Sequence, residues 1–131
     1  CMQLGSHGST FGGNPLACAV AEQVMIMLSK KSLLNGVKKK EKLFLKELKD
    51  INKEFKCFSA IRSSGLWIGC KLNVTENFNL DTIMKACYAN GLMILKANNN
   101  TIRIAPSLII EDDLILKGLK ILRQAIREQL R

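Results

Sequence analysis

The sequence predicts a small α+β domain of two layers, in which helices pack on one side of a short, mostly antiparallel sheet. Apolar residues recur at helical spacing near both ends of the chain. The middle carries short β-type runs bounded by Gly, Ser and Asn. A length of 131 residues, with 47% hydrophobic and 24% charged residues, suits one modest hydrophobic core and argues against disorder.

A glycine-rich loop and a proline-started helix are predicted at the beginning of the chain. Asn14 is placed to cap this helix, and Pro15 suits its first position because an N–H there would have no helical partner. A second, amphipathic helix follows, with lysines around an apolar face that consists of Leu34, Val37, Phe44, Leu48, Ile51 and Phe55. We expect the two helices to share an apolar seam.

The periodicity changes after Cys57. Two short strands are predicted, the second over residues 66–72, with a break between them at residues 63–65. A third helix follows, which Asp81 is placed to cap and Gly91 to stop.

A hairpin and a closing helix complete the predicted domain. Segments 92–95 and 101–105 flank the turn-forming residues 98–100, all asparagine, and Pro106 ends the second strand. The last helix starts near the acidic residues 111–113, which suit the positive end of its dipole. Its inward side is predicted to consist of Leu114, Leu119, Leu122, Ile126 and Leu130.

Composition narrows the class of protein. The net charge of +9 would suit nucleic acid, an anionic membrane or acidic metabolites, but the run 38–40 lies in a helical pattern with few aromatic neighbours, which favours a solvated helix face. Five dispersed cysteines and one histidine argue against a metal site or a disulfide framework. No membrane span or signal sequence is recognisable. We therefore expect a cytoplasmic protein with no nucleic-acid or membrane partner.

The densest polar cluster is the loop of residues 5–14, directly before the first helix. Its glycines let backbone N–H groups approach an anion, Ser9 and Thr10 add hydroxyl donors, and the helix N-terminus adds a favourable dipole. The loop lacks the lysine of a P-loop and does not match other phosphate or nucleophile motifs. An anion site and a simple flexible turn explain these residues equally well.

His7 lies beside Ser6 and Ser9, which raises the possibility of a hydrolase. A nucleophile needs a base and an orienting group at a defined geometry, and adjacency in the sequence does not supply it. A loop histidine bonded to the backbone is the favoured interpretation.

Arg103 lies between Ile102 and Ile104 on a predicted strand, so alternation places it on the face opposite the two isoleucines. It is either an exposed strand arginine, which spacing alone favours, or a bidentate ligand for a carboxylate. Trp67 could stack on a ligand, but a lone tryptophan in an apolar strand is expected in the core.

Residues 5–21, GSHGSTFGGNPLACAVA, resemble the signature loop and following helix of the class III (ornithine-type) pyridoxal-phosphate aminotransferases. Four later segments resemble, in the same order, the C-terminal part of bacterial acetylornithine/succinyldiaminopimelate aminotransferases. They are LNGVK at 34–38, GLWIGC at 65–70, NGLMIL at 90–95 and IRIAPSL at 102–108. The resemblance covers essentially the whole chain.

This resemblance implies the small domain of a fold-type I pyridoxal-phosphate enzyme. Residues 1–14 would be the cofactor-phosphate loop at the end of the large domain, and residues 15–131 the C-terminal small domain with its leading helices. The implied reaction transfers an amino group between N-acetylornithine, or N-succinyl-diaminopimelate, and 2-oxoglutarate in arginine and lysine biosynthesis. Members of the family are homodimers.

The resemblance also implies roles for three residues. Thr10 matches the threonine that binds the cofactor phosphate of the other subunit, and Ser9 matches a residue near the substrate. Arg103 matches the arginine associated with a substrate carboxylate, which reverses the preference from spacing.

Two departures qualify the resemblance. The family's Schiff-base lysine lies upstream of the Ser-Thr loop, so we expect this chain to contain no catalytic residue and to be catalytically incomplete alone. Residues 61–65, IRSSG, differ from the Arg-Gly pair and further glycine of the relatives. The alternative to part of an aminotransferase is a non-catalytic basic binding or interaction module left from a split or decayed gene.

Overall fold

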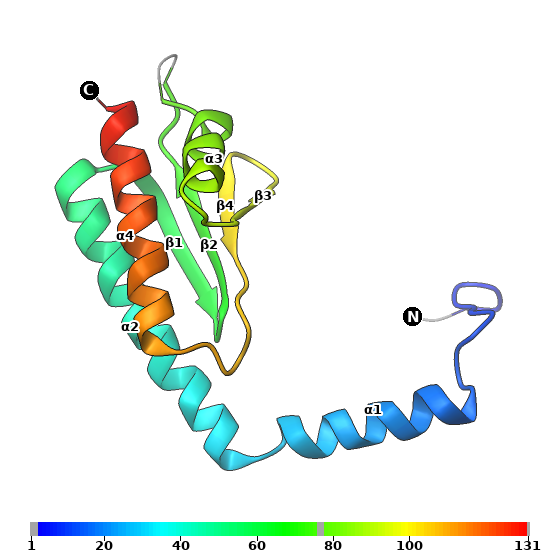
Figure 1. Cartoon of the computed structure of the whole chain (residues 1–131). Coiled ribbons are helices and arrows are strands. Elements are labelled where there is room, and N and C mark those ends of the chain that lie inside the picture. Colours follow the sequence, from blue (N-terminus) through cyan, green and yellow to red (C-terminus); the bar gives the residue numbers. More distant parts are fainter. Residues whose placement is uncertain (1–2, 76–77, 131) are drawn as a thin grey trace. The chain divides into compact units, whose positions relative to one another are not determined.

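The structure is a computed structural model that describes residues 3–75 and 78–130. Figure 1 shows the four helices and four strands of these residues. The chain divides into two compact units, one up to Leu34 and one from Asn35 onward. The two units are described in turn.

The first unit contains a loop and helix α1 (Pro15–Leu28). Asn14 caps α1, because its side-chain oxygen accepts a hydrogen bond from the Ala17 N–H at 2.9 Å, and Pro15 is the first helical residue. The predicted start of this helix is therefore confirmed.

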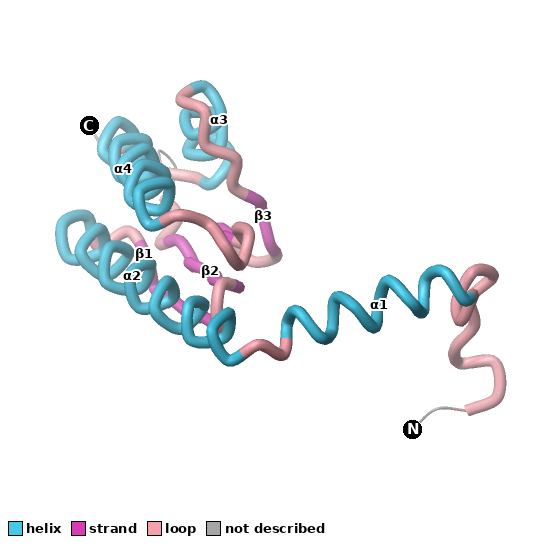
Figure 2. The backbone as a smooth tube through the Cα atoms, turned by 60° about the horizontal axis from the view of Figure 1, so that its bottom comes forward, coloured by secondary structure: helices cyan, strands magenta, loops and turns pink. Residues whose placement is uncertain are grey.

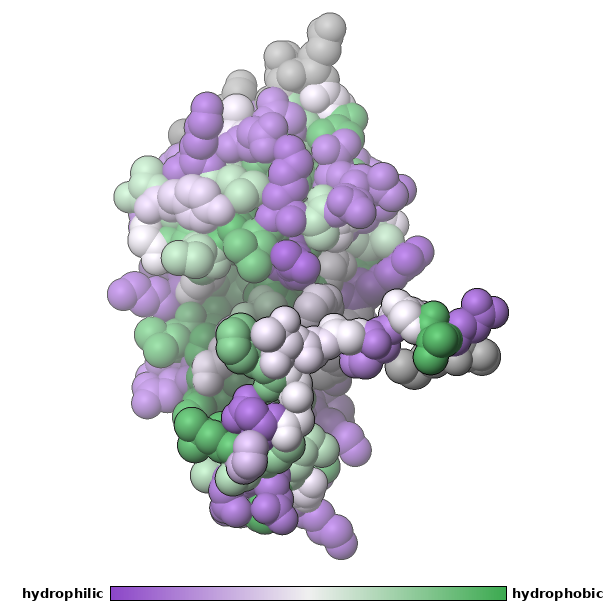
Figure 3. Space-filling model, turned by 90° about the vertical axis from the view of Figure 1, so that its right-hand side faces the viewer, coloured by the Kyte–Doolittle hydropathy of each residue, from purple (hydrophilic) through white to green (hydrophobic). Residues whose placement is uncertain are grey.

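Helix α1 buries none of its residues within its own unit. Apolar residues occur all round the helix instead of forming one stripe. The apolar seam between this helix and the next stays a prediction, because α1 and most of the next helix belong to different units. Figure 3 shows hydrophobic residues standing at the surface among hydrophilic ones. The exposed large residues of α1 are Leu16, Val20, Val24, Met25, Ile26 and Met27.

Helix α2 (Lys31–Phe55) provides the first apolar layer of the second unit. Phe44, Leu48 and Ile51 are fully buried at spacings of four and three, as an amphipathic helix requires. Val37 and Phe55 pack against the core at the margins of this face. The predicted amphipathic helix is confirmed, except that Leu34, predicted on its apolar face, is 48% exposed.

The sheet has the strand order β1-β2-β4-β3, and every neighbouring pair is antiparallel. Its strands are β1 (Phe58–Ser64), β2 (Trp67–Leu72), β3 (Leu95–Ala97) and β4 (Thr101–Ile104). A tight turn joins β1 to β2 where Gly65 has φ +60°, which favours glycine. Helix α3 (Leu80–Ala89) then carries the chain past β2, so that β4 pairs with β2.

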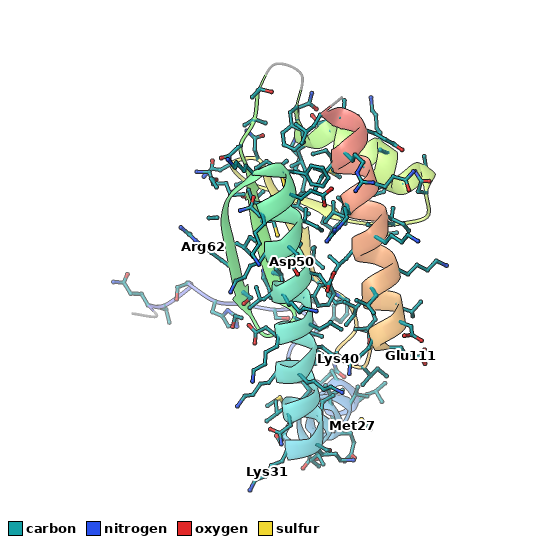
Figure 4. The ribbon with its side chains drawn as sticks, turned by 90° about the vertical axis from the view of Figure 1, so that its left-hand side faces the viewer. Met27, Lys31, Lys40, Asp50, Arg62 and Glu111 are labelled. Carbon is teal, nitrogen blue, oxygen red and sulfur yellow. The ribbon has the colours of Figure 1, made fainter. Side chains whose placement is uncertain are left out.

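One face of the sheet is buried and the other is exposed. Ile68, Cys70 and Ile102 are fully buried and belong to one core cluster with residues of α2, α3 and α4. The exposed face carries Arg62 and Trp67, and Figure 4 shows the Arg62 side chain projecting from β1 away from α2. Figure 2 shows α2 and α4 side by side along the strands. The predicted two-layer arrangement is confirmed.

Helix α3 starts and stops close to the predicted positions, but its cap differs. Asn79 is the N-cap, accepting a hydrogen bond from the Thr82 N–H at 3.1 Å, and Asp81 lies in the first turn instead. An extended Asn79 directly before the helix can reach that N–H, whereas Asp81 already has helical neighbours on both sides. Gly91 follows the helix with φ +79°, as a C-terminal stop requires.

The β3–β4 hairpin is shorter than predicted. Residues 92–94 are not strand, because the Leu92 N–H donates back to the Cys87 carbonyl and the Tyr88 hydroxyl donates to the Ile94 carbonyl at 2.7 Å. Asn99 and Asn100 both have positive φ, 57° and 53°, a conformation that asparagine tolerates. The asparagine turn is therefore confirmed.

Helix α4 (Asp112–Gln129) closes the core with an inward side that differs at its ends from the prediction. Its buried residues are Ile115, Leu119, Leu122, Ala125 and Ile126. Leu114 and Leu130 were predicted inward and are exposed. Leu114 precedes Ile115 by one residue, which turns it about 100° away from the buried stripe.

A neighbouring pair of substitutions checks this register of α4. Ile115→Ala should lower the free energy of unfolding by about 2–5 kcal/mol, because it removes a buried side chain and leaves a cavity. Leu114→Ala should cost about 1 kcal/mol or less, since Leu114 is 54% exposed and Ile115 only 1%. Urea denaturation followed by circular dichroism measures both values. Equal losses would contradict the register.

Three cysteine thiols are predicted to resist alkylation. Burial raises the pKa of Cys57 to about 11, of Cys70 to about 12 and of Cys87 to about 11, from an ordinary value of 9.0. At pH 8, peptide-level mapping of iodoacetamide adducts should show rapid labelling of the exposed Cys18 and slow labelling of these three. In the unfolded chain, Cys18 and these three cysteines should all be labelled rapidly. Burial also links these thiols to stability, because their pKa values are higher in the folded chain than in the unfolded chain. The stability that the neutral buried thiols contribute is complete below pH 9 and is lost as pH rises toward 11.

Candidate functional site

The loop before α1 is held by hydrogen bonds from its own side chains. The Ser9 hydroxyl oxygen accepts a hydrogen bond from the Gly12 N–H at 2.8 Å. A Cβ on Gly12 would lie 2.8 Å from the Ser9 Cβ, so only glycine fits this close turn. Asn14 links the loop to the helix, since its amide donates to the Phe11 carbonyl while its oxygen caps α1.

Thr10 lies at the exposed tip of this turn. Its hydroxyl makes no hydrogen bond to any residue in the described ranges, so its proton is available to a ligand. The Ser9 hydroxyl already accepts one hydrogen bond and keeps its own proton to donate. The two adjacent hydroxyls can therefore both donate to an anion.

The loop offers dipoles but no positive side-chain charge. Residues 3–29 contain neither lysine nor arginine. A phosphate bound there would gain hydrogen bonds and the positive end of α1, while its charge would need a cation from another part of the protein. The loop is thus suited to contribute to a phosphate site rather than to form one alone.

The arrangement around His7 does not support a hydrolase. The Ser6 hydroxyl donates to the Gln3 carbonyl at 2.6 Å and accepts from the Gln3 N–H, so it is engaged away from His7. His7 makes no hydrogen bond to Ser6 or to Ser9. The predicted backbone partner of this histidine is also not found within the described residues.

Arg103 lies in β4 on the exposed face of the sheet, as alternation predicts. It pairs with Gly69 of β2 and with Leu95 of β3. Its guanidinium carbon lies 5.7 Å from the centre of the Trp67 ring, within the range of a cation–π interaction. The structure therefore brings together two of the residues that the sequence singled out.

The core position predicted for Trp67 is wrong, since this residue is 63% exposed. Trp67 begins β2, and its sequence neighbours, Leu66 in the turn and Ile68 in the strand, are both buried. Alternation then places the indole on the exposed face, on the same side as Gly69. An apolar run with a tryptophan in it does not reveal which of its residues point inward.

Arg62 is a candidate that the sequence reasoning did not select. It pairs across the sheet with Gly69, so Arg62 and Arg103 lie on either side of the same glycine in one row. Neighbouring strands are about 4.8 Å apart, which separates the two arginine backbones by about 10 Å. No local sequence pattern indicates this row, because it depends on the register of β1 against β2.

An apolar cavity of about 240 Å³ lies beside Arg103 in the second unit. Arg103 is the one charged residue in its lining, which otherwise comes from α4, from residues 92–95 and from residues 104–106. Phe44 of α2 and Ile110 also line it. A positive charge beside an apolar hollow can orient a ligand that has a carboxylate and an aliphatic part.

A comparison with protein families identifies the class of this chain. The model of the class III aminotransferases matches residues 1–126, so the chain belongs to the class III aminotransferase family.

Two curated relatives indicate where in the family it stands. The chain is 46% identical over 126 residues to the acetylornithine/succinyldiaminopimelate aminotransferase of Buchnera aphidicola subsp. Acyrthosiphon pisum, covering 96% of this chain and 31% of that protein. It is 42% identical to the succinylornithine transaminase of Yersinia enterocolitica, covering 97% and 31%. The chain thus spans about a third of the length of the curated relatives it matches.

Solved structures of aminotransferases have the same fold. The N-acetylornithine aminotransferase of Stenotrophomonas maltophilia superimposes with a TM-score of 0.78 at 35% identity, over 91% of this chain and 33% of that one. The ornithine aminotransferase of Plasmodium yoelii gives 0.81 at 28% identity, over 98% and 34%. The predicted fold class, the small α+β domain of a fold-type I aminotransferase, is confirmed.

Substitution of Gly12 tests the loop geometry. Gly12→Ala should break the Ser9–Gly12 hydrogen bond, because the added Cβ would overlap the Ser9 side chain. Nuclear magnetic resonance should show large amide shift changes from residue 9 to residue 14. Gly8→Ala is the matched control, since a Cβ there meets nothing within 4 Å. Comparable changes in both variants would show that the turn is not constrained as described.

Proposed function

We propose that this chain is the C-terminal part of a pyridoxal-phosphate-dependent aminotransferase that acts on N-acetylornithine or N-succinyl-diaminopimelate with 2-oxoglutarate. The observation that carries the proposal is the 46% identity to the Buchnera enzyme over 96% of the chain. The family is pyridoxal-phosphate-dependent. The substrates follow from the names of the relatives and from the resemblance of their C-terminal parts.

Thr10 is proposed to bind the cofactor phosphate. Its free hydroxyl, its place on a constrained turn and the nearby N-terminus of α1 fit a phosphate group. The lack of lysine and arginine in residues 3–29 means that the neutralising charge comes from elsewhere, in keeping with a loop that reaches the cofactor of another subunit. Pyridoxal phosphate, when bound, supplies the electron sink for amino-group transfer.

Ser9 is proposed to line the substrate site next to Thr10. Its oxygen accepts the Gly12 N–H, which holds the oxygen in place and leaves the hydroxyl proton free to donate. The residue can then donate one hydrogen bond to a substrate oxygen.

Arg103 is proposed to hold a substrate carboxylate. Its side chain has no acidic partner within the described part of the chain, so its charge is not neutralised internally. A guanidinium offers two parallel N–H donors to a carboxylate, which a lysine cannot do. The apolar cavity beside it would accommodate the aliphatic part of an amino acid.

The remaining assignments belong to the same proposal. We place residues 1–14 at the end of the large domain and residues 15–131 in the small domain. The lysine that binds the cofactor covalently would lie in the large domain, so that this chain alone does not catalyse amino transfer. The complete enzyme would be a cytoplasmic homodimer without nucleic-acid or membrane partners. Within the described residues, no helix is both long and apolar enough to cross a bilayer.

A chimaeric enzyme tests the proposed function. The segment of the Buchnera enzyme that this chain matches would be replaced by the chain, and amino transfer from N-acetylornithine and from N-succinyl-diaminopimelate to 2-oxoglutarate measured. We expect activity with at least one donor. In this chimaera, Arg103→Met should raise a substrate KM about 10- to 100-fold, because a charge-assisted pair of hydrogen bonds is lost.

Conservative variants separate chemistry from folding. Thr10→Val should weaken cofactor binding about 2- to 10-fold while Thr10→Ser retains it, because only valine removes the hydroxyl. Arg103→Lys should recover less than half of the substrate affinity that Arg103→Met loses, since lysine keeps the positive charge but cannot donate two parallel hydrogen bonds. A folded chimaera that binds the cofactor and transfers no amino group would favour the non-catalytic module instead.

A further inference from the structure

Trp67 and Arg103 form a side-chain pair on the exposed face of the sheet. The guanidinium carbon lies 5.7 Å from the indole centre. Gly69 is the residue directly opposite Arg103, and Trp67 precedes Gly69 by two positions on the same face. The two side chains are therefore diagonal neighbours, a separation that long and aromatic side chains can bridge.

Gly69 leaves the space over β2 open for this contact. A Cβ at this position would lie 3.4 Å from the Thr101 methyl group, which is an ordinary van der Waals contact, so glycine here is not required by the backbone. With no side chain between them, the indole and the guanidinium can meet across the strand.

The Arg103 Nε is buried and has no hydrogen-bond partner in the described residues. Four of the five guanidinium donors are on the two Nη atoms, and these are not among the buried atoms that lack a partner. A carboxylate can bind an arginine through the Nε and one Nη, or end-on through both Nη atoms. Burial of the Nε leaves the end-on approach.

The exposure of Trp67 has no explanation in the core. Leu66 and Ile68 fill the buried positions on either side of it, and the indole remains 63% exposed. The Arg103 guanidinium lies over its ring, and tryptophan is the most favourable aromatic partner for such a cation.

We propose that Trp67 is a positioning residue for Arg103, holding the guanidinium with its two Nη atoms directed at a substrate carboxylate. The inference rests on the proposed role of Arg103. The ring restricts the rotamers of a long, flexible side chain before the ligand binds, which lowers the entropy lost on binding. Trp67 itself makes no bond to the substrate.

Arginine side-chain dynamics in the 131-residue chain test the positioning directly. The heteronuclear NOE of the Arg103 Nε–H group should show restricted motion in the wild-type chain and in Trp67→Phe, and increased motion in Trp67→Leu. Because Trp67 is exposed, the leucine variant should fold as the wild type does, which amide spectra check. Lys71→Gln is the matched control, since it removes an exposed charge from the same strand and face.

Titration with glutarate, a five-carbon dicarboxylate, tests the consequence for binding. Trp67 is the only tryptophan, so its fluorescence reports on the wild type and on Arg103→Met, and the Arg103 Nε–H shift reports on the two Trp67 variants. Trp67→Leu should raise the Kd for glutarate about 2- to 5-fold, as expected for a lost exposed cation–π contact. Trp67→Phe should stay within about 2-fold, and Arg103→Met should abolish the response.

The two measurements fail separately. Unchanged Arg103 motion in Trp67→Leu would overturn the positioning role, whatever glutarate does. The same follows if glutarate binds through Arg103 with equal Kd in Trp67→Leu and wild type. A third outcome is that Trp67 restricts the motion of Arg103 but glutarate does not bind through Arg103. This outcome would overturn the proposed carboxylate role of Arg103, and the inference would fall with it.

Discussion

The alternation of side chains along β2 is the constraint on which the second unit depends. Ile68 and Cys70 point into the core, where they meet residues of all three helices of that unit. The alternate positions of the strand, Trp67 and Gly69, therefore lie on the other face. A shift of one residue in the register would exchange the two sets, burying an open glycine and exposing the centre of the core. The same register that builds the core therefore fixes where Arg103 and Trp67 meet.

Most of the fold could be predicted from the sequence, because its elements have strong local signals. Proline after a capping asparagine marks the start of α1, and lysines around an apolar stripe define α2. Three consecutive asparagines mark the turn before β4. The errors lie where the local signal is shared by neighbours. Leu114 and Ile115 are equally apolar, and only packing against the sheet decides which of them turns inward.

The candidate site was predicted less completely, for a physical reason. Arg103 could be placed on the outer face because two isoleucines flank it, and Ser9 and Thr10 because a glycine-rich loop precedes a helix. The neighbours of Arg103 come from other strands. Arg62 lies in the same row and Trp67 is a diagonal neighbour, and both placements depend on a register that no local pattern specifies. Trp67 was misplaced because an indole adds so much apolar surface that sequence patterns favour burial, even where a cation partly covers it.

The strand order has a consequence for how the domain is made. On the ribosome, β1 and β2 emerge together and can form their hairpin at once, but the second edge of β2 pairs with β4, which is synthesised about thirty residues later, after α3. During that interval β2 has an unsatisfied row of backbone N–H and C=O groups along one edge. Such an edge is a template for pairing with another nascent chain. The central position of β2 in the finished sheet thus makes it the most vulnerable strand during synthesis.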